Sequence, residues 1–204
     1  MIELYAISDD PAPPDPPLRA VPCGDLTALC APAQEGTVTS EALWRHEEIV
    51  EELMATRNVL PVRFGTLLPD ERSAARAVSS RQAELAASLD RVRGAVELAV
   101  RAQPSEPTAE EAPRSEATGR DYMRAKSRRT ERARRLHESL APAARDSVVR
   151  AEAEGLRAAY LVDRDAVDRF VSMVRRLQRL HPDLDILCTG PWPPYSFAES
   201  GGPS

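Results

Sequence analysis

The chain has 204 residues, of which 42% are hydrophobic and 29% charged, and its formal net charge is −5. This composition supports a packed core in one large domain or two small ones. The acidic excess argues against a dedicated nucleic-acid binder, because neutralising phosphates requires a surplus of basic side chains. The N-terminus resembles no signal peptide, and no stretch approaches the roughly 20 apolar residues of a membrane span. We therefore expect a cytoplasmic protein, or one on an intracellular structure, without a membrane segment.

The first ninety residues predict a strand, a hairpin, a helix, a second strand and a long helix, from their apolar spacing and turn signals. They are, in order, a strand at 2–7, a hairpin at 18–31 with its turn at Cys23-Gly24-Asp25, a helix from Thr39 or Ser40 to about Arg57, a strand at 59–64 and a helix at 69–92. Pro61 indicates that the second strand lies at a sheet edge or has an irregular start. The first helix shows one apolar face with Leu43, His46, Val50 and Leu53.

The second half predicts a different succession of elements. They are a strand at 95–100, a flexible acidic loop at 103–118, a basic helix at 119–140, a strand at 144–153 with helix as the alternative, a strand at 156–162, a helix from Asp163 or Asp165 to about Leu180, a strand at 184–188, and a tail at 190–204. From Gly94 the order is βαββαβ, the order of a ferredoxin-like sheet. The sequence thus predicts an α+β protein of two domains. Residues 1–93 form a small sheet with two helices, and residues 94–204 form a ferredoxin-like domain.

Side chains suited to catalysis or metal binding are scarce. His46 and Glu47 would suit a general base or a metal pair, but a zinc site needs three or four ligands and the chain has three histidines without HExxH spacing. A buried, hydrogen-bonded His46 is favoured. Phosphate-binding glycine loops and the GxSxG nucleophile elbow are absent from the sequence. We expect no enzyme, no cofactor and no metal.

The three cysteines are Cys23, Cys30 and Cys188, an odd number without CxxC spacing. We expect reduced thiols that behave as small buried apolar groups, with a redox pair of Cys23 and Cys30 as the alternative. A buried Arg63 on the strand at 59–64 would require a carboxylate from the preceding helix. The alternative there is an exposed edge that receives a partner.

Two segments could contact other molecules. The favoured interpretation of the basic segment 120–135 is a solvated helix face whose charges balance those of the acidic loop before it. A surface for an acidic protein partner comes second and a nucleic-acid surface third, because the net charge is negative and only 4% of residues are aromatic. The tail places Trp192, Tyr195 and Phe197 among prolines, which lowers its entropy cost on docking. It docks either on its own domain or on another chain.

Several of these segments together resemble the gas vesicle protein F/L family over nearly the whole chain. They are Leu4-Tyr5-Ala6-Ile7, His46-Glu47, the run VLPVRFGT at 59–66, the run GRDYMRAK at 119–126, Ala159-Tyr160-Leu161-Val162, and the run TGPWPPYSF at 189–197. The resemblance implies a minor gas vesicle component without catalytic activity, built as two α+β domains of which the second is ferredoxin-like. The segments leave both the F and the L type open.

The resemblance also implies partners and contact residues. The partners would be the major gas vesicle shell protein, whose aggregation the chain would limit while it supports vesicle nucleation, and other gas vesicle accessory proteins. The candidate structural or partner-contact residues are His46, Glu47, Arg63, Phe64, Tyr122, Lys126, Trp192, Tyr195 and Phe197. The alternative function is a small-molecule-sensing or nucleic-acid-binding module on a ferredoxin-like scaffold.

Overall fold

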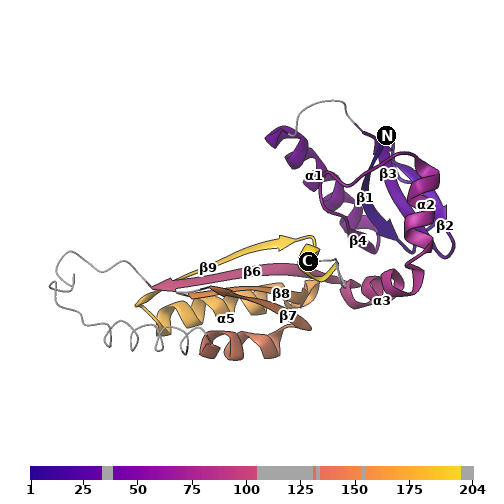
Figure 1. The fold of residues 1–204 in the computed structure, drawn as a ribbon. Coiled ribbons are helices and arrows are strands. Elements are labelled where there is room, and N and C mark those ends of the chain that lie inside the picture. The colour runs from indigo at the N-terminus through magenta and orange to yellow at the C-terminus, as the bar shows by residue number, and fades with distance from the viewer. Residues whose placement is uncertain (34–38, 105–130, 132–133, 153–154, 199–204) are drawn as a thin grey trace. The chain divides into compact units, whose positions relative to one another are not determined.

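The computed structural model describes residues 1–33, 39–104, 131, 134–152 and 155–198, and Figure 1 shows their fold. The contacts divide the chain into two compact units. The first unit contains residues 1–95 and the described residues from Trp192 onward, and the second contains residues 96–191. The tail therefore belongs to the first unit, whereas the sequence placed it in the C-terminal domain. The predicted α+β class is confirmed.

The first unit is built on a five-stranded antiparallel sheet. Its strands are β1 (Ile2–Ser8), β2 (Arg19–Cys23), β3 (Leu26–Pro32), β4 (Val59–Pro61) and β5 (Leu67–Leu68). Strand β1 pairs with β3 on one side and with both β4 and β5 on the other. β2 and β3 form the predicted hairpin, in which Gly24 adopts a φ of 74°, a conformation that glycine accepts without steric cost.

Helix α1 (Ser40–Thr56) begins as predicted, because the Thr39 side chain accepts a hydrogen bond from the Ala42 amide at 3.1 Å. Its inner face buries His46, Val50 and Leu53, and these pack the helix against the sheet. Leu43 was expected on the same face, but its side chain is 42% exposed.

The predicted long helix at 69–92 is wrong, because the structure has two helices there. Helix α2 (Glu71–Ser79) begins at the capping side chain of Asp70, and helix α3 (Gln82–Val92) follows. The break falls at Arg81, whose φ of −124° and ψ of 22° leave the helical region. The apolar spacing continues across the break, so the sequence pattern gave no sign that one helix ends and another begins there.

The strand predicted at 59–64 is also shorter than expected. β4 ends at Pro61, and its position at the end of the β2-β3-β1-β4 order confirms the predicted edge. Phe64 and Gly65 then form a turn that leads into β5, a strand that the sequence did not predict.

The second unit contains a four-stranded sheet in the order β7-β8-β6-β9. Its elements are β6 (Ala95–Pro104), a helix at 134–140, β7 (Asp146–Glu152), β8 (Gly155–Asp163), α5 (Val167–Leu180) and β9 (Leu184–Trp192), with short 3₁₀ turns at Ala141–Ala143 and Arg164–Ala166. Both helices lie on one face of the sheet (Figure 1). Leu136 and Leu140 from the first helix share a core with Phe170 and Val174 from α5.

The order of elements in the second unit agrees with the prediction, and three details differ. Helix α5 starts after a 3₁₀ turn without a side-chain cap from Asp163 or Asp165. β9 continues to Trp192 instead of ending at Cys188, and β6 extends to Pro104. Most of the predicted acidic loop, and the first part of the basic helix, lie outside the described residues.

Candidate functional site

His46 is 1% exposed and joins three parts of the first unit. Its Nε2 lies 2.9 Å from the Val62 carbonyl oxygen, and its Nδ1 lies 3.0 Å from Glu3 Oε1. Because a carbonyl oxygen only accepts, Nε2 donates to the Val62 oxygen, while Nδ1 faces the Glu3 carboxyl. The ring stacks on Tyr5 at a centroid distance of 4.7 Å and meets the edge of Phe64 at 5.5 Å. The expectation of a buried, hydrogen-bonded histidine is confirmed.

These contacts fix the segment from Val62 to Thr66. The Val62 amide donates to the Tyr5 carbonyl at 2.9 Å, and the Leu4 amide donates to the Thr66 carbonyl at 3.0 Å. Between them Gly65 adopts a φ of 78° and its amide faces Glu3 Oε1 at 3.4 Å. The segment is therefore held by β1 on its backbone and by His46 from α1, and we call it the anchored segment.

An apolar groove with a volume of about 320 Å³ lies beside the anchored segment. Val62, Arg63 and Thr66 form part of its wall. Ala77 of α2 and Tyr195 of α6 (Tyr195–Ala198) line it elsewhere, together with aliphatic side chains of β1, β4 and α3. A concave, mainly aliphatic surface with few polar groups is suited to binding apolar side chains.

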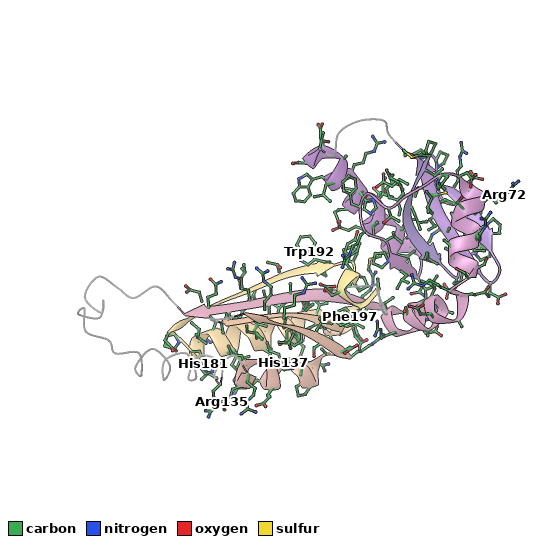
Figure 2. The ribbon with its side chains drawn as sticks, in the orientation of Figure 1. Arg72, Arg135, His137, His181, Trp192 and Phe197 are labelled. Carbon is green, nitrogen blue, oxygen red and sulfur yellow. The ribbon has the colours of Figure 1, made fainter. Side chains whose placement is uncertain are left out.

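The tail contributes to this site because it docks on the first unit of its own chain. Phe197 is 1% exposed, and its carbonyl accepts a hydrogen bond from the Arg91 guanidinium of α3. Tyr195 packs against the core that α1 shares with the sheet. Trp192 is 42% exposed. Figure 2 shows Trp192 and Phe197 on this returning segment. The docking had no sequence signal beyond the aromatic residues themselves.

Glu47 lies close to the Tyr195 hydroxyl. Burial first, and then the carboxylates of Glu47 and Glu51, raise the pKa of the Tyr195 phenol well above its usual value. His46 thus contacts β1, while the adjacent Glu47 acts on the tail through its charge. The sequence singled out this pair but did not link it to the tail.

Arg63 is exposed, so the expectation of a buried arginine on a strand is wrong. The physical reason is that β4 ends two residues earlier, at Pro61, so that Arg63 follows the edge strand instead of lying within it. Its position at the groove wall makes it accessible to a partner.

Tyr122 and Lys126 lie outside the described residues. In the described part of the basic helix, Arg134 contacts Glu131 with two nitrogens at 3.0 and 2.7 Å, and Arg135 contacts Glu131 at 3.1 Å. These hydrogen bonds lower the pKa of Glu131 to about 2. This part of the helix (Figure 2) therefore carries a solvated face whose arginines pair within the helix, and the predicted pairing with the acidic loop lies outside the described residues.

Cys23 and Cys30 are buried as expected, whereas Cys188 is only half-buried. Cys23 and Cys30 are fully buried and all three thiols are free. Burial raises the pKa of Cys23, and burial with the charge of Glu71 raises the pKa of Cys30 to about 11.

Two further observations concern the described residues alone. No group of three or more His, Cys, Asp or Glu side chains among them is arranged to hold a metal ion. Within the same residues, no helix has the length and apolar character needed to cross a membrane.

Comparison with known proteins gives consistent matches. A profile of the family described as gas vesicle synthesis protein GvpL/GvpF matches residues 4–199. Gas vesicle protein L of Streptomyces sp. (strain CB03234) is 32% identical over 209 residues, which cover 88% of this chain and 77% of that protein. Gas vesicle protein F2 of Halobacterium salinarum (strain ATCC 700922 / JCM 11081 / NRC-1) is 28% identical over 167 residues. The alignment covers 79% of this chain and 70% of that protein.

Solved structures show the same fold. Gas vesicle protein GvpF from Anabaena sp. PCC7120 has a TM-score of 0.77 at 18% identity, over 98% of this chain and 99% of that one. GvpF from Microcystis aeruginosa has a TM-score of 0.76 at 16% identity, over 97% and 98% of the two chains. Fold and sequence together define the class of gas vesicle proteins. Within that class, the chain belongs to the gas vesicle synthesis protein GvpL/GvpF family, and the resemblance seen in the sequence is confirmed.

The His46 contacts predict a specific loss of stability. Replacing His46 by Leu fills the same space with an apolar side chain but leaves the Val62 carbonyl without its His46 donor and removes one partner of the Glu3 carboxyl. We expect the free energy of unfolding to fall by about 1–3 kcal/mol, because a buried polar group left unpaired costs about that much. The measurement is urea unfolding, with Arg45→Leu on the exposed face of the same helix as control. Equal losses in the two variants would contradict the role given to His46.

The neighbouring phenol predicts a dependence on alkaline pH. Burial, with the charge of Glu3, raises the pKa of Tyr5 to about 12 in the folded protein, against about 10 for an unfolded chain. The resulting stability is complete below about pH 10 and is lost as the pH rises from about 10 to 12, because the unfolded chain then holds fewer protons. Urea unfolding of Tyr5→Phe should show a shallower loss above about pH 10 than the native chain. If the free energy of unfolding fell equally with pH in Tyr5→Phe and in the native chain, the assignment to Tyr5 would be contradicted.

Proposed function

We propose that this protein is a non-catalytic assembly factor in gas vesicle formation, which binds the major shell protein and limits its aggregation. Its place of action would be the cytoplasm, at the forming vesicle, together with other gas vesicle accessory proteins. Membership of the GvpL/GvpF family supports the role in gas vesicle formation. The observation that supports binding is the apolar groove beside the anchored segment.

The groove has features that suit an apolar polypeptide segment. A shell subunit that awaits assembly must expose apolar surface, and such surfaces aggregate unless they are covered. The groove offers aliphatic walls from Leu60, Val62 and Leu85, while the exposed Arg63 provides a polar group at its wall. Apolar walls with a polar group would bind a segment by its apolar side chains and fix its orientation.

The polar groups near the groove support a binding role over a catalytic one. His46 and Glu3 hydrogen-bond each other, and His46 also donates to the Val62 carbonyl. These side chains complete the fold, because a buried polar group must find its partner internally.

The groove predicts which variants separate binding from folding. Ala77 is exposed and lines the groove, so Ala77→Trp should fill the groove without disturbing the core. We expect co-purification with the shell protein to fall at least about tenfold, since filling the groove removes the buried apolar contact. Ser79→Trp, at an exposed position of the same helix that does not line the groove, is the matched control.

The same variants should be expressed from an otherwise complete gas vesicle gene set, with vesicle yield as the second readout. Loss of binding and yield in Ala77→Trp but not in Ser79→Trp would support the groove. Unchanged co-purification in Ala77→Trp would overturn the groove as the binding site. Normal vesicles in a strain that lacks this protein and any paralogue would overturn the role in gas vesicle assembly.

We also propose that the two units are separate domains and that the second is ferredoxin-like. The order β-helix-β-β-helix-β, the sheet order β7-β8-β6-β9 and the two helices on one face support this assignment. The proposed boundary lies near residue 95, and the tail from Trp192 belongs to the first domain.

Separate domains predict that the second unit folds alone. A fragment of residues 96–191 retains Phe170, Tyr160 and the core around them. We expect it to unfold cooperatively in urea, as small single domains do. Circular dichroism provides the measurement, and a gradual transition without cooperativity would show that the units depend on each other.

A further inference from the structure

Helix α1 presents a second surface on the side opposite to His46. Trp44 and Glu48 lie two residues before and after His46, which turns each of them about 200° away from it around the helix axis. Glu51 and Glu52 follow on the same side, because residues three and four apart are neighbours on a helix. All four side chains are exposed, and Trp44 is 64% exposed. We call Trp44, Glu48, Glu51 and Glu52 the acidic α1 face.

One cation, Arg45, lies beside this face, three residues before Glu48, and the three carboxylates outnumber it. In the part of the chain that the structure describes, Glu48, Glu51 and Glu52 form no ion pair. Glu48 and Glu52 are four residues apart, a spacing at which like charges destabilise a helix by a few tenths of a kcal/mol. The last turn of α1 contains no basic residue to offset the negative end of the helix dipole. The face therefore carries an excess of negative charge, which favours the approach of an additional cation.

A hollow accompanies the exposed tryptophan. Trp44 borders a shallow surface hollow with a volume of about 530 Å³, whose charged borders are Glu41, Glu48 and Arg45. An exposed indole beside a hollow with acidic borders has the anatomy of a binding hot spot, in which an aromatic anchor is surrounded by polar groups.

We propose that the acidic α1 face binds a basic amphipathic helical segment of a partner protein. An apolar side chain of that segment packs on Trp44, and its Lys or Arg side chains pair with Glu48, Glu51 and Glu52. Charge complementarity selects this partner, because an acidic surface repels nucleic acid and anionic lipid. The proposal concerns a surface apart from the groove, so it stands or falls independently of the proposed function.

The test uses a synthetic amphipathic helix of about 18 residues that contains only Leu and Lys, and a second peptide with Glu in place of every Lys. The protein contains two tryptophans, so a Trp192→Phe background makes Trp44 the only indole. Fluorescence titration should show a blue shift of the Trp44 emission with the Leu/Lys peptide, since binding removes the indole from water, and no shift with the Leu/Glu peptide.

Charge-reversed variants locate the binding. The double variant Glu48→Lys, Glu52→Lys should bind the Leu/Lys peptide at least about tenfold more weakly. Two charge pairs are lost and repulsion is added in their place. The double variant Asp165→Lys, Asp168→Lys makes the same change in net charge on exposed residues of the second unit. Its affinity for the Leu/Lys peptide should stay within about twofold of that of the unchanged protein. Circular dichroism confirms that both double variants are folded.

The outcomes are decisive in both directions. Binding with a Trp44 shift that is lost in the α1 variant alone supports the proposal. Equal weakening in both double variants would show that net charge alone attracts the peptide, and binding without a Trp44 shift would place it elsewhere, so either result overturns the proposal. Ala77→Phe, which occupies the groove without adding an indole, should bind the peptide normally in the same assay, which separates this face from the groove.

Discussion

The first unit depends on one buried contact, the bridge from His46 to Glu3 and Val62. The ring is 1% exposed and lies between two aromatic side chains, so its polar atoms have no access to water. In that setting an unpaired polar group costs more than a hydrogen bond gains, and the three partners must stay together. The bridge thereby fixes helix α1 to β1 and to the anchored segment, which in turn forms part of the groove wall.

Each side of helix α1 consequently has a different role. Its inner side holds His46, Val50 and Leu53 against the sheet. Glu47 lies near Tyr195, the tail residue that lines the groove. Its outer side exposes Trp44 among carboxylates. A rigid helix of this kind can present a partner surface because its position is already determined by packing.

Local patterns in the sequence predicted much of this fold. The hairpin at Gly24, the cap at Thr39 and the order of elements in the second unit each follow from a nearby signal, such as a turn residue, a capping side chain or an apolar period. The burial of His46 followed from its place among apolar residues on one helix face.

The remainder depended on tertiary contacts that no local pattern reveals. The break at Arg81 leaves the apolar spacing intact, and β5 consists of two residues that become a strand only by pairing with β1. The docking of Tyr195 and Phe197 joins residues far apart in the chain. Trp44 had a signal that was not used, since it is a large apolar residue on the polar side of a helix.

The most direct test of the account is hydrogen–deuterium exchange of the native chain, alone and bound to the shell protein. The account predicts slower exchange on binding in the anchored segment, in α2 near Ala77 and in α6, because these border the groove. It also predicts that the amides of the second unit keep their exchange rates. Protection confined to the second unit, or exchange unchanged around the groove in a complex shown to be intact, would contradict it.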